Sequence, residues 1–457
     1  MCFVCRTSHP LLLVMLTYWH MFFFFLFFCF VFSFLSICTH RFAWRVIPTA
    51  TTVKNITVVL KENLYFQVIL VASSMRVLVC GGAGYIGTHF VRALLRRTSH
   101  SVVILDSLEA THGRSAHIDT EENLARNQRC SSEQVHAGRH AVLEVGDVRD
   151  EAFLNDVFTR HAPIDAVVHM CAFIVVPESV RDPLMYYDNN VIGIIRLLQV
   201  MRAHHCDKII FSSTAALFGN PAAHATGGGA TVSMEPIHPD ATKNPESPYG
   251  ETKLVTEWIL KDCAYAYGVK SICLRYFNAC GADEDGDIGE DHDPETHLIP
   301  LILRVPLATE INKRRKALQQ APVDEFVSIF GTDYPTPDGT CVRDYIHVYD
   351  LSTAHILALD YLVGLDPKEK STFFSAFNLG TSRGYSVREV IEAARRVTGH
   401  PIPVKESARR EGDPPVLVAS GEEAKKALGW ELKYDNIDKI IASAWKFHQS
   451  HPLGYSS

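Results

Sequence analysis

The sequence lacks the charge balance of a nucleic-acid-binding protein and the cysteine pattern of a disulfide-stabilised one. Its 44 lysines and arginines are outnumbered by 51 aspartates and glutamates, so the formal net charge is −7 and no nucleic-acid partner is indicated. Apart from the lone Cys2 and Cys5 pair, the 12 cysteines are scattered singly, and Cys80 and Cys273 stand in apolar runs. This usage is typical of buried reduced thiols, so no disulfide framework is expected.

Metal-ligand spacings and carboxyl-terminal address signals are also lacking. The 22 histidines show no recognisable ligand spacing, so most are expected at the surface or in hydrogen bonds, and no metal ion is predicted. The chain ends Gly454-Tyr455-Ser456-Ser457, which resembles neither a peroxisomal nor an endoplasmic-reticulum signal.

Charge is almost absent near the N-terminus, where His20 is the sole acidic or basic residue between Pro10 and Cys38. This stretch is long enough to span a bilayer, which takes roughly 20 apolar residues. Residues 1–74 are therefore interpreted as a signal anchor, a cleaved signal peptide or upstream sequence read through before a start at Met75. A cleaved signal fits least, because the apolar region is too long. A cytoplasmic enzyme starting at Met75 is expected, the alternative being a membrane anchor that leaves the catalytic part in the cytosol.

A glycine-rich turn, Gly81-Gly82-Ala83-Gly84-Tyr85-Ile86-Gly87, directly follows the apolar run Val77–Cys80. The residues after it have the apolar spacing of a helix. A strand, a glycine turn and a helix are the context in which a dinucleotide pyrophosphate meets the amides of a helix N-terminus. Asp106 ends the next apolar run, about 20 residues on, where a carboxylate holds a ribose 2′-hydroxyl and disfavours a 2′-phosphate. The pattern predicts a site for NAD.

Alternating strand and helix signals continue to about residue 280 and predict an α/β fold with a doubly wound parallel sheet, a Rossmann fold. Residues 75–280 are predicted to bind NAD. Residues 281–457 are predicted to form a smaller, mainly substrate-binding domain, with some segments returning to the sheet. Loops are expected at 109–140, 227–229, 283–295 and 304–322, one helix at 186–205, and further helices at 350–362, 386–399 and 422–428.

Tyr249 and Lys253 are four residues apart, which on a helix places the phenol and the ammonium on one face. The spacing alone is weak evidence, but it follows a predicted strand that ends in Ser212-Ser213-Thr214. A lysine and an oxidised nicotinamide nearby both favour the phenolate, and a phenolate poised near neutral pH can take a proton from a sugar hydroxyl. Thr214 is expected to share that proton.

Several motifs follow one another in order from Met75 to the C-terminus: Gly81–Gly87, Asp147, Ser212–Thr214, Tyr249 with Lys253, Arg275–Asn278, Val342–Tyr345 and Arg410–Asp413. The series resembles the UDP-glucose 4-epimerases (UDP-galactose 4-epimerases) of the extended short-chain dehydrogenase/reductase family. The Cys171–Phe173 stretch and the insertions bear some resemblance to trypanosomatid-type members.

The resemblance implies a role for each matching residue. Catalysis would fall to Tyr249, Lys253 and Thr214. NAD would contact Gly81, Gly84, Tyr85, Ile86, Gly87, Asp106, Ser107, Asp147, Val148, Asn189, Tyr249, Lys253 and Phe277. The UDP moiety would contact Asn278, Leu298, Arg343, Tyr345, Arg410 and Asp413, in line with the paired hydrogen bonds that arginine makes to phosphates.

The activity implied is the interconversion of UDP-glucose and UDP-galactose through a 4-keto sugar, with hydride cycling on bound NAD, as a step of galactose metabolism. A homodimer is also implied. Three residues depart from the family pattern: Ile174 replaces a lysine that reaches the cofactor, Pro177 replaces a glycine and is expected to restrict its loop, and Thr214 replaces a serine. Leu417, four residues beyond Asp413, is expected to disfavour N-acetylated sugars.

Rival activities share the fold. A nucleotide-sugar 4,6-dehydratase needs an acid and a base after the threonine, whereas Ala215 and Ala216 stand there. A decarboxylase or a net dehydrogenase is left open by the residues, and an NAD-sensing protein would need neither Tyr249 nor Thr214.

Overall fold

The computed structural model describes residues 54–59, 65–70, 74–109, 118, 141–220, 233–365, 372–410 and 413–455. The charge-poor stretch 10–38, most of the expected loop 109–140 and the triglycine 227–229 lie outside these residues. The chain divides into two units, residues 1–73 and 74–457. In the first, β1 (Lys54–Val59) and β2 (Tyr65–Leu70) pair antiparallel. Within the described residues, no helix is both long and apolar enough to cross a bilayer.

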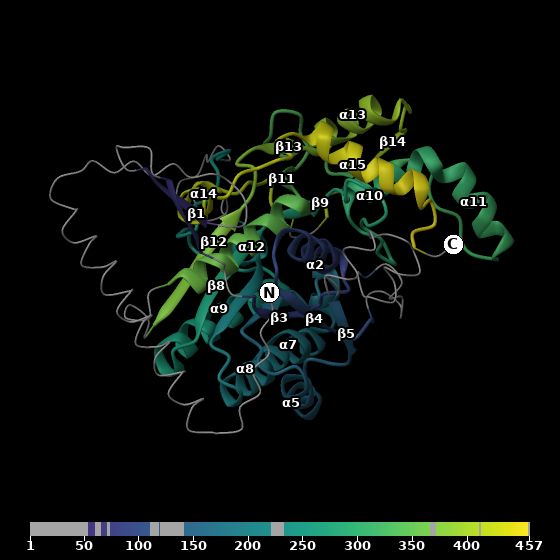
Figure 1. Cartoon of the computed structure of the whole chain (residues 1–457). Coiled ribbons are helices and arrows are strands. Elements are labelled where there is room, and N and C mark those ends of the chain that lie inside the picture. The colour runs from purple at the N-terminus through teal and green to yellow at the C-terminus, as the bar shows by residue number, and fades with distance from the viewer. Residues whose placement is uncertain are drawn as a thin grey trace, which may run out of the picture. The chain divides into compact units, whose positions relative to one another are not determined.

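The second unit contains a sheet of seven parallel strands in the order β12-β8-β7-β6-β3-β4-β5 (Figure 1). The central strands are unbroken apolar runs because helices cover both of their faces. The strands are β3 (Arg76–Cys80), β4 (Ser101–Asp106), β5 (Ala141–Val145), β6 (Ala166–His169), β7 (Lys208–Thr214), β8 (Lys270–Tyr276) and β12 (Phe373–Leu379).

Side chains of each strand alternate between two cores, as the period of two in a strand requires. Val77 and Val79 of β3 pack on one face, whereas Leu78 and Cys80 pack on the other. The first face is covered by α2 (Tyr85–Arg97), α12 (Val348–Gly364) and α14 (Glu422–Leu428), and the second by α5 (Glu151–Arg160), α8 (Gly193–Ala203) and α9 (Pro248–Tyr267). This doubly wound arrangement is the predicted Rossmann fold.

The strand order reverses between β3 and β6. From β3 the chain winds outward through β4 and β5, then returns to β6 and winds the other way. In an open parallel sheet the loops on either side of such a reversal part at the carboxyl ends of the strands and leave a crevice. The glycine turn follows β3 and therefore lies at this crevice.

The rest of the second unit is a smaller layer of short strands and helices around its own apolar core (Figure 1). A four-stranded part joins β13 (Gly384–Ser386), β11 (Val342–His347) and β15 (Val416–Leu417), with β9 (Asn278–Cys280) also paired to β11; β10 (Val327–Phe330) pairs with β14 (Val404–Ser407). Its helices are α10 (Leu298–Arg304), α11 (Ala308–Ala317), α13 (Val387–Thr398) and α15 (Ile437–Ser450).

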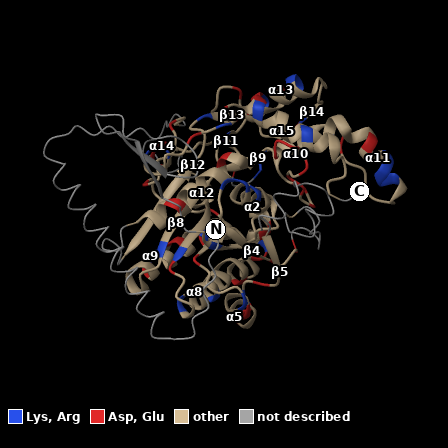
Figure 2. Cartoon of the chain, in the orientation of Figure 1, with Lys and Arg blue, Asp and Glu red and all other residues tan. Residues whose placement is uncertain are grey.

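The structure confirms the helices predicted at 350–362, 386–399 and 422–428 but overturns the loop expected at 304–322, where α11 forms. Pro306 does not break this helix, because it lies in the preceding 3-10 turn, η4 (Val305–Leu307). Only Ala308 and Ile311 of α11 are buried, so its sequence lacks an apolar stripe. Three residues of its basic run, Arg314, Arg315 and Lys316, lie in the last turn, where they complement the helix dipole, and blue colouring marks the basic residues of α11 in Figure 2.

Candidate functional site

A continuous cleft of about 1660 Å³ opens at the carboxyl ends of the central strands. It extends from the glycine turn to the short strands of the smaller layer. All of the residues predicted to bind or react line it: Gly81, Gly84, Tyr85, Ile86, Gly87, Asp106, Ser107, Asp147, Val148, Asn189, Thr214, Tyr249, Lys253, Phe277, Asn278, Leu298, Arg343, Tyr345, Arg410 and Asp413.

The glycine turn needs glycine for two different reasons. Gly81 has φ of +83°, and a Cβ there would lie 2.5 Å from the Cys171 nitrogen beyond β6. A Cβ on Gly87 would lie 2.1 Å from the Gly81 carbonyl oxygen, so α2 could not approach the turn. Gly84, in contrast, could take a Cβ, which would make an ordinary contact 3.6 Å from the Gly81 carbonyl oxygen, and it is the N-cap of α2 without a side-chain cap. The structure therefore presents a bare helix N-terminus that can receive a phosphate.

Asp106 lies at the end of β4 beside the turn. One carboxylate oxygen accepts a hydrogen bond from the Ala83 amide and the other from the Leu108 amide, each at 2.9 Å. Burial raises the pKa of this carboxyl group, and the two amides oppose the rise. The side chain is thus held at the wall where a ribose hydroxyl would be bound.

Asp147 lies across the cleft, at the end of β5. Arg149 donates hydrogen bonds to both of its oxygens, from Nε to Oδ1 at 3.1 Å and to Oδ2 at 3.0 Å and from Nη2 to Oδ2 at 2.6 Å, and these bonds lower the pKa of the carboxyl group. The neighbouring Val148 is buried. The pair offers a polar edge and an apolar surface, a combination that suits a purine ring.

Asn189 lies on a π-helical turn, η1 (Asp188–Ile192), that interrupts the single helix predicted for 186–205 between α7 (Pro183–Tyr187) and α8. Its amide donates to the Asn190 side-chain oxygen at 2.9 Å. Asn190 in turn bonds both main-chain groups of Phe173, at 2.9 and 3.0 Å. The π turn, a feature common at functional sites, thus positions Asn189 and the loop beyond β6 together.

The two departures in that loop lie in the cleft wall. Ile174 is 42% exposed and brings no charge to the cleft. Pro177 lies in the first turn of α6 (Val176–Arg181), where proline is favoured, so the expectation that it restricts a loop was wrong.

Tyr249, Lys253 and Thr214 meet where α9 crosses the end of β7. Lys253 is 4% exposed, and its Nζ donates to the Ser212 carbonyl oxygen at 2.9 Å. Burial lowers the pKa of Lys253 to about 8. Burial also raises the pKa of the Tyr249 phenol, against a hydrogen bond with Thr214. Contrary to the expectation from the Tyr–Lys spacing, the protein groups by themselves hold this pKa above its ordinary value.

The far end of the cleft carries the residues predicted to hold UDP. Arg343 of β11 bonds the Val342 carbonyl oxygen at 2.9 Å and faces Asp413 at 3.6 Å. Arg410 stacks on the Phe330 ring at 4.1 Å. Asn278 donates to the Asp344 carbonyl oxygen at 3.2 Å, which joins β9 to β11. Two guanidinium groups therefore stand at this end, where they can bind a diphosphate.

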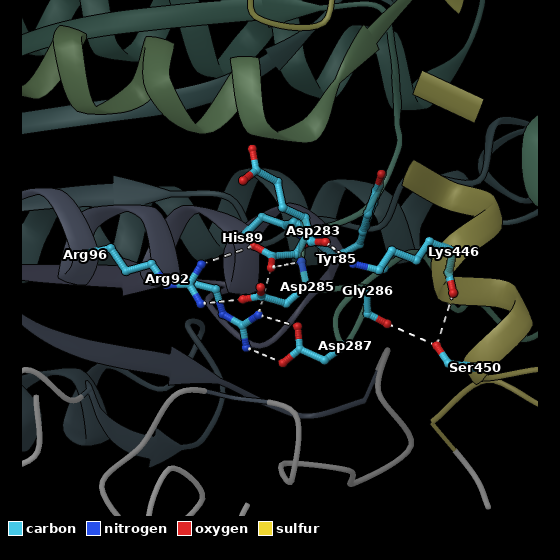
Figure 3. A network of polar contacts seen from close by, with 12 residues as sticks. Tyr85, His89, Arg92, Arg96, Asp283, Asp285, Gly286, Asp287, Lys446 and Ser450 are labelled. Carbon is cyan, nitrogen blue, oxygen red and sulfur yellow. Dashed lines mark hydrogen bonds and ion pairs between the residues drawn. The ribbon is translucent and has the colours of Figure 1, made fainter. Parts of the chain in front are cut away.

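An ion-pair network anchors the segment after β9 to α2 (Figure 3). Arg92 pairs with Asp287 at 2.6 Å and with Asp283 at 3.3 Å, and Arg96 pairs with Asp285 at 2.9 Å. The segment continues to Leu298 at the start of α10. The cofactor-side helix and a substrate-side loop are thereby joined.

Sequence reasoning missed a cluster in that same segment. Glu290, His292, Glu295 and His297 line the cleft, and their ligand-type atoms all lie within 4.8 Å of one another. Burial alone would lower the histidine pKa values, but the carboxylates outweigh it and raise them to about 9 for His292 and about 10 for His297. The alternation of Glu and His over eight residues was the available signal.

Comparison with known proteins agrees with this architecture. The model of the NAD dependent epimerase/dehydratase family matches residues 77–380. The chain is 44% identical over 381 residues to the UDP-glucose 4-epimerase of Streptococcus mutans serotype c, covering 83% of this chain and 99% of that one.

Solved structures give the same result. A UDP-glucose 4-epimerase at 41% identity matches with a TM-score of 0.69, covering 84% of this chain and 100% of its own. The Bifidobacterium longum UDP-glucose 4-epimerase, solved in complex with NAD+ and UDP, matches at 35% identity with a TM-score of 0.67, covering 83% and 100%. With a glycine turn at the reversal of a parallel sheet and a tyrosine and lysine in the same cleft, this chain belongs to the NAD dependent epimerase/dehydratase family.

Proposed function

We propose that this chain interconverts UDP-glucose and UDP-galactose and retains one NAD through each turnover. One observation carries the proposal: the glycine turn, the Tyr249–Lys253 pair and the two guanidinium groups line a single cleft. The Streptococcus mutans relative bears the name UDP-glucose 4-epimerase, and the Bifidobacterium longum structure holds NAD+ and UDP.

NAD fits the residues at the turn. The uncapped N-terminus of α2, with Gly84 in the cleft lining, suits its pyrophosphate, and Asp106 suits a ribose hydroxyl. We assign Asp147 and Val148 to the adenine, Asn189 to the inner region of the cofactor, and Ser107 and Phe277 to the remaining contacts. Bound NAD would supply a hydride acceptor for the sugar C4 and a positive charge that would lower the Tyr249 pKa, which burial has raised.

Tyr249 acts as the acid and base in this proposal. Its phenolate oxygen takes the proton of the C4 hydroxyl as a 4-keto sugar forms, and returns it to the same oxygen when hydride adds to the opposite face of C4. Thr214 bonds the phenol and keeps it oriented. Lys253, held by the Ser212 carbonyl oxygen, supplies a positive charge beside the ribose.

The guanidinium groups hold the other half of the substrate. Arg343 and Arg410 would bind the diphosphate, while Asn278, Leu298, Tyr345 and Asp413 complete the uridine end. Two arginines bound to the diphosphate leave the sugar free to turn, which a return of hydride to the other face requires.

The test uses the full chain, purified without added nucleotide, and UDP-galactose. Formation of UDP-glucose, followed by anion-exchange chromatography without added NAD, is the expected result. A requirement for stoichiometric NAD, with accumulation of an oxidised sugar, would instead identify a net dehydrogenase. Loss of water from the sugar would identify a dehydratase, although Ala215 and Ala216 provide neither the acid nor the base for it.

We also infer a homodimer through the face formed by α6, α7 and α9. This face exposes large apolar side chains: Val180 is 61% exposed, Leu184 79%, Trp258 57% and Tyr265 69%. Trp258 and Tyr265 are seven residues apart and share a face of α9. An exposed apolar patch of this kind is typical of an interface.

Sedimentation equilibrium tests the dimer. The wild-type chain should sediment as a dimer and Trp258→Glu as a monomer. Tyr361→Glu, which places a charge at a 37% exposed position on α12, should remain dimeric. A wild-type chain that is monomeric at all concentrations would contradict the inference.

A further inference from the structure

Glu290, His292, Glu295 and His297 form a cluster between β9 and α10 whose nitrogen and oxygen atoms converge. His297 Nδ1 lies 2.9 Å from Glu290 Oε1 and 3.3 Å from Glu295 Oε1. His292 Nδ1 lies 3.3 Å from Glu290 Oε1 and 3.8 Å from Glu295 Oε2. Two imidazoles and two carboxylates thus approach one another in a small volume.

These atoms are close without being paired by hydrogen bonds. His292 Nδ1, His297 Nδ1 and Glu295 Oε2 are buried and make no hydrogen bond of acceptable geometry. Glu295 is fastened from the other side, because its Oε1 accepts the amides of Thr296 and His297, both at 2.8 Å. Its side chain has no exposed surface. A fixed, buried carboxylate therefore directs into the cluster an oxygen that accepts no hydrogen bond and lies 3.8 Å from His292 Nδ1, a costly arrangement unless something else binds that oxygen.

The separations match those of a tetrahedral metal site. Zinc binds histidine nitrogen at about 2.0–2.1 Å and carboxylate oxygen at about 2.0–2.2 Å, so tetrahedral ligand atoms lie about 3.3–3.5 Å apart. Four nitrogen–oxygen separations in the cluster, two to Glu290 Oε1 and one each to Glu295 Oε1 and Oε2, are 2.9, 3.3, 3.3 and 3.8 Å and bracket this value, and one ligand atom from each residue lies within 4.8 Å of the others. A dication in place of two imidazole protons would leave the charge of the cluster unchanged.

Two other groups of potential metal ligands among the described residues do not combine converging ligand atoms with a buried carboxylate oxygen that accepts no hydrogen bond. Asp283, Asp285 and Asp287 face Arg92 and Arg96, which supply positive charge already. The group of His238, Asp240 and Glu423 is exposed, with side chains 55%, 89% and 44% accessible. In the Glu290–His297 cluster, by contrast, the ligand-type atoms converge around two buried carboxylates, with side chains 5% and 0% exposed, and the Glu295 Oε2 atom accepts no hydrogen bond.

We propose that Glu290, His292, Glu295 and His297 bind a Zn²⁺ ion that stabilises the wall of the cleft. Mixed imidazole and carboxylate ligands suit zinc, and four protein ligands make a closed site of the structural kind. The ion fastens the segment that leads into Leu298 and α10. His292 also packs edge-on against Tyr85 of the glycine turn, with ring centroids 6.3 Å apart. The ion thereby secures the part of the cleft that lies between the glycine turn and α10, and it takes no part in proton or hydride transfer.

Zinc binding by the full chain tests the proposal without any nucleotide or sugar. The chain is treated with a chelator, dialysed, and titrated with Zn²⁺ alone, and bound metal is measured by atomic emission spectroscopy. One equivalent is expected, and Co²⁺ in its place should give the visible bands of four-coordinate cobalt. The melting temperature should rise with Zn²⁺.

Variants locate the site. The double variant His292→Ala/His297→Ala and the single variant Glu295→Gln should bind zinc at least about 100-fold more weakly, since loss of even an outer partner costs about 10–100-fold. The matched control His238→Ala/Asp240→Asn removes the same residue types from the exposed group and should keep the full equivalent. Glu295→Gln preserves the shape of the side chain, and circular dichroism verifies that the variant is folded.

Two outcomes would overturn the proposal: no zinc bound and no thermal shift in the wild-type chain, or equal zinc binding in the wild type and in both cluster variants. In either case the cluster consists of imidazolium–carboxylate ion pairs alone. Because no step measures turnover, failure here leaves the epimerase proposal untouched, and failure of UDP-galactose conversion leaves the zinc result untouched.

Discussion

Arg275 and Glu257 form a doubly hydrogen-bonded ion pair inside the protein, with the Arg275 Nε atom 2.8 Å from one carboxylate oxygen and Nη2 2.6 Å from the other. Their side chains are 5% and 3% exposed. Ser213 also donates to Glu257, at 2.6 Å. The pair joins α9, which carries Tyr249, to the ends of β7 and β8, so it fixes the catalytic helix against the sheet.

Removal of one partner of the Arg275–Glu257 pair should lower the stability of the fold. Glu257→Leu leaves a buried guanidinium unpaired and should lower the free energy of unfolding by about 3–5 kcal/mol in urea denaturation. The matched control is Asp438→Ala, which breaks the exposed pair with Arg396 (side chains 50% and 59% exposed) and should cost less than about 1 kcal/mol. Equal small losses in both variants would show that the buried pair does not anchor the helix.

Tyr249→Phe should lower the rate of UDP-galactose conversion by about 10²–10⁴-fold, the usual contribution of general acid–base catalysis. The NAD content, measured by chromatography after denaturation, should stay close to that of the wild type. Tyr187→Phe serves as the control, because its hydroxyl bonds Glu251 outside the cleft. Unchanged turnover in Tyr249→Phe would remove the tyrosine from the mechanism.

Gly87→Ala should lose bound NAD, because the new Cβ would lie 2.1 Å from the Gly81 carbonyl oxygen and force α2 away from the turn. A fall in NAD affinity of tenfold or more is expected, equivalent to about 1.4 kcal/mol per factor of ten. Gly364→Ala meets no atom within 4 Å at the end of α12 and should retain NAD. Full NAD content in Gly87→Ala would place the cofactor elsewhere.

His355 should make the protein sensitive to acid. Burial lowers its pKa to about 4, despite the hydrogen bond to the Leu351 carbonyl oxygen. Between the unfolded value near 6.5 and about 4, the unfolded chain binds the extra proton, so stability falls as the pH falls through this range. At pH 4, this difference in proton binding lowers the free energy of unfolding by about 3 kcal/mol.

Urea denaturation of wild-type and His355→Gln chains from pH 7 to pH 4 measures that loss of stability. The stability advantage of the wild type should shrink by this amount on acidification. Ile272→Val, a buried change without a titratable group, should keep a constant difference from the wild type. If the difference in stability between the wild type and His355→Gln stayed constant with pH, His355 would bind its proton equally well in the folded and the unfolded chain, which would contradict the prediction.

Leu417→Ala should widen the range of sugars. Leu417 lies on β15, lines the cleft and packs against Leu217, Phe218, Ile237 and Leu254. Truncation should raise kcat/KM for UDP-N-acetylglucosamine relative to UDP-galactose by about tenfold or more. Val418→Ala, buried but outside the cleft wall, is the control. Efficient wild-type turnover of the N-acetylated sugar would contradict the role of Leu417.

The parts of this fold with a strong local pattern could be predicted from sequence. β3, the glycine turn and α2 carry an apolar run, a glycine spacing and a helical stripe, and all three lie where they were expected. Most of the site residues could be named because they stand in motifs that resemble those of the family, whereas Asn189 and Leu298 lie outside these motifs and were named from the resemblance alone. These residues line one cleft because of the order of the strands in the sheet, and no local sequence pattern predicts that order.

Features that depend on tertiary contacts were missed. The helix α11 buries only Ala308 and Ile311, so its sequence reads as a polar loop. The π turn at Asp188–Ile192 has the same apolar spacing as an α-helix and shows itself only through the bonds of Asn190 to Phe173. The raised pKa of Tyr249 follows from burial, which residue spacing does not measure. The convergence of Glu290, His292, Glu295 and His297 requires a loop conformation that the alternation alone leaves open.

The position of β12 means that the predicted NAD-binding residues 75–280 do not contain the whole of the large sheet. Phe373–Leu379 comes after much of the substrate-binding layer in the chain, yet it is the last strand of the large sheet and pairs along the whole of β8. A chain that ends before residue 372 would leave the hydrogen-bonding groups of β8 unpaired along one edge, beside the buried Ile272 and Leu274. The sheet is therefore complete only when this late strand has been made, and we expect products truncated before it to aggregate through the exposed edge of β8.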